Sequence, residues 1–402
     1  MFQFQLADRL KNVQMSASAA MTRKVRELRA QGVKIVGLSS GEPDFKSPAH
    51  AIEAANKAAL ASDTKYPPQD GQRALKEAVQ RKFKRENNLD YALDEIMISN
   101  GSKQIMFGAT MASVNPGDEV VIPAPGWISY ADQVKLCGGV PVPVSCPENN
   151  QFKLRAADLD AAMTPRTKWV VLNFPNNPTG AICNYDQMRE IADVLLKHPR
   201  VMVMADEIYE HLRYDGVPFY SIAAVEPKLK ERTLTVNGAS KAYAMTGWRV
   251  GFAGGPKALI VGMNNMQGQA TGGVSTVGQA ATLAALDGPQ DLIQSHRYDY
   301  QKRRDEVVTM IRAAKGLTCH KPEGAFYVFP NMAGCIGKTS KGGRVIKTDT
   351  DFVTALLEEA HVATVQGAAY GMSPYFRISY ATDIESIREG CRRIQEFCND
   401  LR

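Results

Sequence analysis

Four side chains that suit one kind of chemistry follow one another along the chain, each close to the end of an apolar run. Lys241 ends the run that starts at Leu234, and Arg249 comes eight residues later. Asp206 ends an earlier run, with Tyr209 three residues further on. An amine can form an imine, a carboxylate can bind a ring nitrogen, a phenol can bind a ring hydroxyl and a guanidinium can bind a phosphate. Together these groups predict a site for pyridoxal 5′-phosphate.

Each of these residues taken alone has an ordinary structural explanation. A lysine after a strand is usually a solvated surface residue, and an aspartate there is usually a helix cap or a turn residue. The motif Asn173-Phe-Pro-Asn-Asn177-Pro-Thr-Gly180, which offers Asn177 as a second group for a ring hydroxyl, is typical of a turn. The order of the motifs favours a cofactor site, because ligands of open α/β sheets bind outside the carboxyl ends of the strands.

Further motifs point to one family. They are Gly41-Glu-Pro-Asp-Phe45, Lys65-Tyr66, Gly101-Ser102-Lys103-Gln, Pro125-Gly-Trp127 and Phe376-Arg377-Ile-Ser-Tyr-Ala381. With them, the chain resembles the fold-type I pyridoxal-phosphate aminotransferases of the aspartate aminotransferase family, in the bacterial aspartate/prephenate-type branch, from Ser16 to the C-terminus. The resemblance implies that Lys241 forms an imine with the cofactor and then carries a proton between substrate and cofactor. It also implies a homodimer with active sites at the subunit interface.

The resemblance assigns most of the other motif residues to the cofactor. Asp206 would keep the pyridine nitrogen protonated and so act in catalysis. Tyr209 and Asn177 would bind the ring oxygen, and Trp127 would stack on the ring. A helix start whose backbone amides attract anions would hold the phosphate, together with residues from elsewhere. The predicted phosphate ligands are Gly101, Ser102, Lys103, Ser240, Arg249 and, from a neighbouring subunit, Tyr66.

An arginine in a strand usually lies exposed at a sheet edge, but the resemblance assigns Arg377 to the substrate α-carboxylate, which a guanidinium matches in a two-pronged hydrogen bond. In one bacterial branch of the family, the distal carboxylate of aspartate or glutamate is bound by a lysine beside the phosphate loop and by hydroxyls of the first helix. Lys103 and Ser16 match these positions, with Ser18 nearby. Contacts with the substrate are also expected from Gly41, Trp127 and Asn177. The resemblance therefore implies transfer of an amino group between L-aspartate and 2-oxoglutarate by a ping-pong mechanism.

Two departures from the family pattern leave other substrates open. Gly272 and Gly273 stand in the substrate-facing segment 269–274 where that branch usually has hydroxyl side chains, and Gly126 precedes Trp127 where an aromatic residue is common. Both changes remove bulk, so aromatic keto acids or prephenate could fit. A pyridoxal-phosphate β-lyase would use the same residues. A regulator built on this scaffold would need an added DNA-binding domain, for which the match leaves no room.

The composition is that of an ordinary globular enzyme. The 402 residues are 44% hydrophobic and 22% charged with a net charge of +6, which indicates neither a nucleic-acid nor a membrane partner. The N-terminal residues show no signal peptide. The seven cysteines are scattered without a Cys-x-x-Cys motif, which favours reduced thiols and a cytoplasmic protein. The six histidines form no metal-ligand pattern, so we expect no metal.

Short apolar runs alternate with helix-length segments through most of the chain, which predicts an α/β fold with a mostly parallel seven-stranded sheet between helices. The expected strands are 95–99, 119–122, 140–144, 168–173, 201–205, 233–236 and 250–253. We expect residues 46–295 to form this large cofactor-binding domain. Residues 1–45 and 296–402 would form a smaller α/β domain, with a strand at 324–329 and an exposed excursion at 333–346.

Overall fold

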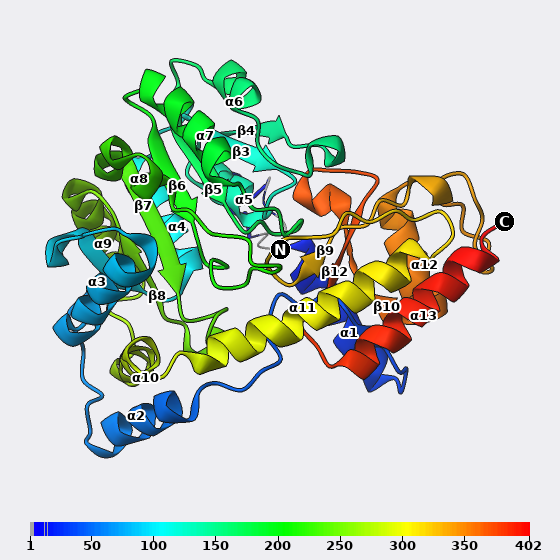
Figure 1. Ribbon diagram of the computed structural model, residues 1–402, viewed down its shortest axis with the longest axis horizontal. Helices are drawn as coiled ribbons and strands as arrows, with labels where there is room; N and C mark the ends of the chain where they lie inside the picture. Colours follow the sequence, from blue (N-terminus) through cyan, green and yellow to red (C-terminus); the bar gives the residue numbers. More distant parts are fainter. Residues whose placement is uncertain (1–3, 12, 14) are drawn as a thin grey trace.

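The computed structural model describes residues 4–11, 13 and 15–402, and its centre is a seven-stranded sheet (Figure 1). The strand order is β2-β8-β7-β6-β5-β3-β4, and only β8 runs antiparallel to its neighbours. The strands are β2 (Ile96–Ser99), β3 (Glu119–Ala124), β4 (Val140–Ser145), β5 (Thr167–Asn173), β6 (Met202–Asp206), β7 (Thr233–Gly238) and β8 (Gly251–Gly254). The predicted fold class is confirmed, and every strand expected for this sheet is present to within two residues.

Helices cover both faces of this sheet, so its strands are apolar on both sides. On β5, Trp169 and Val171 pack into a core with α4, α5 and α9, whereas Val170 and Leu172 pack on the opposite face with α6, α7 and α8. The helices are α1 (Ala17–Ala30), α2 (Ala49–Leu60), α3 (Arg73–Asn87), α4 (Ser102–Ser113), α5 (Ser129–Leu136), α6 (Ala156–Ala162), α7 (Tyr185–Lys197), α8 (Ile222–Val225), α9 (Lys257–Ala270), α10 (Thr276–Asp287), α11 (Asp291–Arg312), α12 (Asp349–Ala360) and α13 (Ile384–Asp400).

The ends of the chain meet in a second group of elements beside the sheet. Helix α11 runs from the sheet towards this group and packs on α13, while α1 lies close to them (Figure 1). Strand β1 (Val36–Gly37) pairs in parallel with β10 (Val362–Ala363). Strands β11 (Val365–Gln366), β12 (Phe376–Ser379) and β9 (Tyr327–Val328) form an antiparallel sheet. The N-terminal segment is thereby held against the C-terminal elements.

One expectation about this second group is wrong in detail, because only β9 forms of the predicted strand 324–329. The segment 333–346 is exposed at most of its residues, as expected, but Cys335 and Ile346 are fully buried and anchor it in the core. Thr339 forms a bridge to Val345 and exchanges backbone hydrogen bonds with Arg402, so the segment is held down along its length. Within the described ranges no helix is both long and apolar enough to cross a membrane.

Candidate active site

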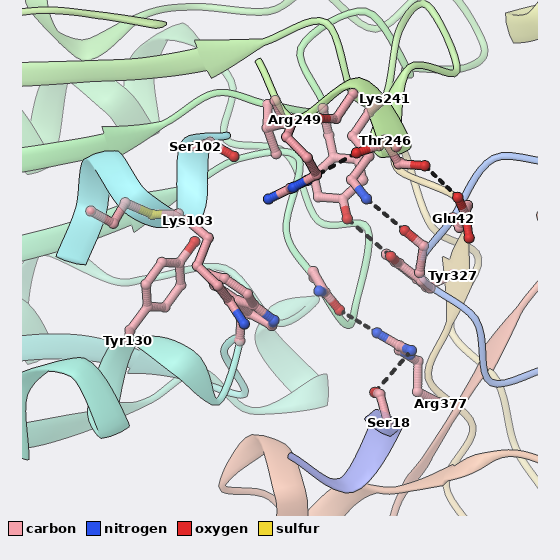
Figure 2. Close-up of a pocket in the computed structure, with 18 residues that line it drawn as sticks. Ser18, Glu42, Ser102, Lys103, Tyr130, Lys241, Thr246, Arg249, Tyr327 and Arg377 are labelled. Carbon is pink, nitrogen blue, oxygen red and sulfur yellow. Dashed lines mark hydrogen bonds between the residues drawn. The ribbon is translucent and has the colours of Figure 1, made fainter. Parts of the chain in front are cut away.

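A cavity of about 420 Å³ opens at the carboxyl edge of the central sheet (Figure 2). Residues that follow β2, β3, β5, β6 and β7 line it, and residues of α1, of the loop after β1 and of strands β9 and β12 close the other side. Its volume lies in the range of small-molecule sites, which is about 300–1,000 Å³. The expectation that the motifs converge at one sheet edge agrees with this geometry.

The Lys241 amine projects into the cavity three residues after β7 ends. Its Nζ donates a hydrogen bond of 2.5 Å to the carbonyl oxygen of Gly41, which belongs to the loop after β1. Burial, and next the positive charge of Arg377, lower the pKa of Lys241 to about 8. A substantial fraction of this amine is therefore neutral near physiological pH, as a nucleophile or a base requires.

Asp206 is a buried carboxylate with neutral partners. Tyr130 Oη donates to its Oδ2 at 2.6 Å, and the backbone N–H of Ile208 donates to its Oδ1 at 3.3 Å. Burial raises the pKa of Asp206 to about 6. No ion pair of Asp206 occurs in the part of the chain that the structure describes. A buried carboxylate in this position lacks a cationic N–H donor, and a protonated pyridine nitrogen would supply one.

Two tyrosines meet beside Lys241. Tyr209 Oη and Tyr327 Oη are 2.9 Å apart, and the Lys241 Nζ lies 5.8 Å from the centre of the Tyr209 ring. Sequence reasoning missed Tyr327, because it lies in an apolar run that reads as an ordinary buried strand. It missed Tyr130 for a similar reason, since this residue lies in the first turn of α5 with no motif of its own.

Arg377 lies on β12 and is only 2% exposed. Its Nη1 donates to Asn177 Oδ1 at 3.0 Å, its Nη2 donates to the Ser39 carbonyl at 2.7 Å, and its guanidinium lies 4.3 Å from the centre of the Tyr327 ring. Its Nε has no partner among the described residues. A buried guanidinium with neutral neighbours and a free N–H is suited to an incoming carboxylate. Asn177 lines the cavity and binds this arginine.

The anion-binding end of the cavity is built at the start of α4. Gly101 caps the helix with φ of 86°, and a Cβ there would stand 2.5 Å from Arg249 Nη2. A Cβ on Gly251 of β8 would stand 2.3 Å from the backbone nitrogen of Ser102. Glycine at both positions therefore lets the guanidinium and the first amides of α4 approach the same space. With Ser240, also on the cavity wall, this cradle fits a phosphate group.

Lys103 and Trp127 stand together at the mouth of the cavity. The Lys103 Nζ lies 4.9 Å from the centre of the Trp127 ring, and both residues line the cavity. Burial, followed by the positive charge of Arg249, lowers the pKa of Lys103. The amine is therefore placed to meet an anionic group that extends beyond the Trp127 ring.

The structure does not bring every predicted residue to this cavity. Ser16 caps α1, where its Oγ accepts from the Ala19 N–H at 3.3 Å. Of these two N-terminal serines it is Ser18 that lines the cavity, with its Oγ 3.4 Å from Arg377 Nη2. Tyr66 is fully exposed and lies outside the lining of its own chain's cavity.

The glycines that depart from the family pattern also lie outside the cavity lining; they are Gly126, Gly272 and Gly273. A Cβ on Gly126 would stand 2.5 Å from the Pro123 carbonyl oxygen, so the backbone requires glycine there. A Cβ on Gly273 would stand 2.8 Å from Pro67 Cγ, which places this segment against the loop that carries Tyr66. In one chain, therefore, neither departure widens the cavity.

Comparison with known proteins agrees with this site. The family model for aminotransferase class I and II matches residues 33–394. An aspartate/prephenate aminotransferase from Cereibacter sphaeroides is 50% identical over 396 residues, which is 98% of this chain and 99% of that protein. The crystal structure of the aspartate aminotransferase from Rhizobium meliloti is similar with a TM-score of 0.96, at 49% identity and covering 100% of both chains. The Thermus thermophilus aspartate aminotransferase with maleate has a TM-score of 0.91 at 38% identity, covering 98% of this chain and 100% of that chain.

The lowered pKa of Lys241 predicts a pH-dependent stability of the cofactor-free protein. From about pH 8 to the ordinary value of 10.5, the unfolded chain binds this proton more tightly than the folded chain does, so wild-type stability rises with pH. Lys241→Met removes this titration. We expect the variant to be more stable than wild type at pH 7 by about 1–3 kcal/mol, and this advantage to shrink by pH 10.

Urea unfolding of both apoproteins at pH 7 and pH 10 measures the two differences. The control is Lys57→Met on α2, because this exposed amine stays in water in both states. An advantage of Lys241→Met that stays the same at both pH values would contradict the proposed burial of the amine.

Proposed function

The chain belongs to the aminotransferase class I and II family, and we propose that it transfers the amino group of L-aspartate, or of a related amino acid, to 2-oxoglutarate by a ping-pong mechanism. The resemblance read from the motifs is thus confirmed, and with it an enzyme that uses pyridoxal 5′-phosphate. The observation that carries the proposal is the buried Asp206 carboxylate, whose neutral donors Tyr130 and Ile208 line the cavity that also holds the Lys241 amine.

Different residues along the cavity would bind different parts of the cofactor. Bound pyridoxal 5′-phosphate supplies the aldehyde that carries the amino group and the ring that accepts electron density from the substrate. Asp206 would keep a proton on the ring nitrogen, and the hydrogen-bonded Tyr209 and Tyr327 would offer hydroxyls to the ring oxygen. Ser102, with the amides at the start of α4, and Arg249 bind the phosphate at the other end.

Lys241 is the proton carrier in this proposal. With its pKa lowered to about 8, the amine can accept the proton of the substrate Cα and deliver it to the cofactor carbon that carries the amino group. Arg377 would hold the α-carboxylate so that the Cα–H bond, and not the bond from Cα to the carboxylate, faces Lys241. This orientation favours loss of the proton over loss of carbon dioxide. The Gly41 carbonyl, which binds Lys241 Nζ at 2.5 Å, keeps the amine on the substrate side.

A dicarboxylate is the substrate that this cavity supports best. Arg377 and Lys103 stand on the lining of the same cavity, one for each carboxylate, and the hydroxyl of Ser18 is added beside Arg377. A broader range that includes prephenate is the second candidate. It is favoured by the name of the Cereibacter sphaeroides relative, an aspartate/prephenate aminotransferase.

We also propose a homodimer in the cytoplasm, with residues 46–295 as the large domain and both ends of the chain as the small domain. The full exposure of Tyr66 supports the dimer. Its hydroxyl does not reach the cavity of its own chain, so a phosphate contact by Tyr66 would have to be made in the cavity of a partner subunit. The glycine-rich segment packed against the Tyr66 loop would then reach the partner's site as well.

The amino-transfer proposal predicts that Lys241→Ala loses turnover but keeps its cofactor site. We expect aspartate-dependent glutamate formation to fall to background, because no other lining group replaces the amine. Pyridoxamine 5′-phosphate should still bind, since Asp206 and Arg249 are unchanged. A coupled assay and equilibrium dialysis measure the two properties, and retained turnover would contradict the mechanism. Ammonia and pyruvate as the wild-type products would indicate a β-lyase.

The substrate proposal predicts a selective effect of Lys103→Met. Loss of a charged hydrogen bond to the distal carboxylate should raise the KM for L-aspartate by about 10–100-fold. The KM for L-phenylalanine should change much less, because that side chain carries no charge. Lys135→Met, an exposed lysine on the neighbouring α5, is the control. Equal effects on both substrates would show that Lys103 serves the cofactor and not the distal carboxylate.

The dimer proposal predicts that Tyr66→Phe weakens cofactor retention by about tenfold, the value of one hydrogen bond to an anion. Mixing Lys241→Ala subunits with Tyr66→Phe subunits should restore tight cofactor binding at some sites, because a mixed dimer has one site with both residues intact. Spectrophotometric titration of the mixture measures this recovery. Unchanged retention in Tyr66→Phe, or a monomer by light scattering, would contradict the proposal.

A further inference from the structure

A buried group of polar side chains lies behind the segment that follows β6. Along this segment Tyr209 lines the cavity, and Asp206 accepts hydrogen bonds from Tyr130 and Ile208, which also line it. Glu207 and Glu210, each 4% exposed, are absent from the lining. Buried carboxylates are costly unless they are paired and hydrogen-bonded. The proposed chemistry uses neither of them, so their partners indicate what they do.

The first set of partners belongs to α3. Lys82, which is 1% exposed, donates to Glu210 Oε1 and, at 2.6 Å, to Asn87 Oδ1. The amide of Asn87 donates in turn to Glu207 Oε2 at 3.0 Å and to Glu210 Oε2. One end of α3 therefore holds both carboxylates at once.

The second set of partners belongs to β7, the strand that leads to Lys241. Asn237 Nδ2 donates to Glu210 Oε1 at 2.8 Å, and Asn237 Oδ1 accepts from the Gly238 N–H at 2.8 Å. The backbone N–H of Glu207 donates to the Val236 carbonyl at 2.9 Å. Asn237 stands four residues before Lys241 in the chain. The carboxylate of Glu210 thus bridges the segment after β6 and the end of β7.

The carboxyl groups of this cluster differ in their charge. Burial, and next the Glu210 carboxylate, raise the pKa of Glu207, which keeps this group protonated. Burial opposes ionisation of Glu210 as well, but Lys82 and His211 hold its pKa below the ordinary value. Glu86 accepts from His211 Nε2 at 3.0 Å and lies 3.5 Å from Lys82 Nζ. The Lys82 ammonium supplies the positive charge among these oxygens.

We propose that Lys82, Asn87, Glu207, Glu210 and Asn237 form a positioning network that sets the distance between the Lys241 amine and the Asp206–Tyr209 segment. The two segments are adjacent through β6 and β7 pairing, but that pairing ends at Asp206 and Val236. Beyond those residues, the side chains of the network replace the missing sheet hydrogen bonds. This role rests on the proposed function, because it places the groups that act in amino transfer.

Three variants separate positioning from stability. Lys82→Met leaves Glu210 buried without its cation, which destabilises a fold strongly, whereas Lys82→Met with Glu210→Gln removes both charges. Asn237→Ala keeps the Lys82–Glu210 pair and cuts only the side-chain link to β7. Arg304→Met, which breaks the pair of the fully buried Arg304 with Asp215 and leaves the five network residues unchanged, is the control for stability alone.

The readouts are thermal unfolding of each apoprotein, the pH midpoint of the visible absorbance of each holoenzyme, and kcat and KM for L-aspartate. We expect the double variant and Asn237→Ala to unfold close to wild type, yet to shift the pH midpoint by about half a unit or more. Their kcat should fall by about 10–100-fold, with KM changed by less than about threefold, because misplaced groups slow the step rather than the binding.

The outcomes distinguish this role from the function itself. A wild-type pH midpoint and kcat in the double variant and in Asn237→Ala would show that the network only stabilises the fold. Arg304→Met should lower the unfolding temperature without moving the midpoint, and a shift there as large as in the network variants would equally overturn the inference. If Lys82→Met does not fold, the double variant and Asn237→Ala decide, and if the double variant does not fold either, Asn237→Ala decides. A wild-type enzyme without transamination would overturn the proposed function, whatever the variants do.

Discussion

The active site depends on keeping charged groups inside a cavity without counter-charges of their own. Among the residues that the structure describes, Asp206 has only neutral donors, and Arg377 has only neutral acceptors and an aromatic face. Such groups are costly to bury, and the cost is met by the stability of the surrounding fold. Because neither group has a partner of opposite charge, Asp206 would attract a cationic ring and Arg377 would attract a carboxylate. The pKa values of Asp206 and Lys241 move towards each other for the same reason, since burial disfavours the charged form of both.

The parallel sheet makes this arrangement possible. Adjacent parallel strands end at one edge, so the residues that follow β5, β6 and β7 meet although helices separate them in the sequence. The strands themselves are buried on both faces and give the edge a rigid base. At the same edge, β2 leads through Gly101 into α4, whose first amides face the cavity. A helix start and three strand ends therefore share one small volume.

The substrate side comes from the opposite group of elements. Strand β12 carries Arg377, β9 carries Tyr327, and the segment after β1 supplies the carbonyls of Ser39 and Gly41. These residues belong to both ends of the chain, which the β1–β10 pairing holds together. The Tyr209–Tyr327 and Arg377–Asn177 hydrogen bonds join the two sides across the cavity. In the proposed site, the cofactor and the substrate would therefore be bound mainly by different groups of elements, which touch at these two contacts.

The sequence by itself determined the strands, the fold class and the residue types at the strand ends, because burial on both faces and glycine at helix starts leave local patterns. Four site residues could be identified from the motifs that accompany these patterns, namely Lys241, Asp206, Arg249 and Arg377. Only the tertiary structure decided which groups surround them. Tyr130 is 76 residues from Asp206, and Tyr327 is 118 residues from Tyr209, so no local pattern links them. It also replaced Ser16 by Ser18 at the cavity and gave Gly126 a backbone role, because the direction of a side chain depends on the packing of the whole element and not on its place in a motif.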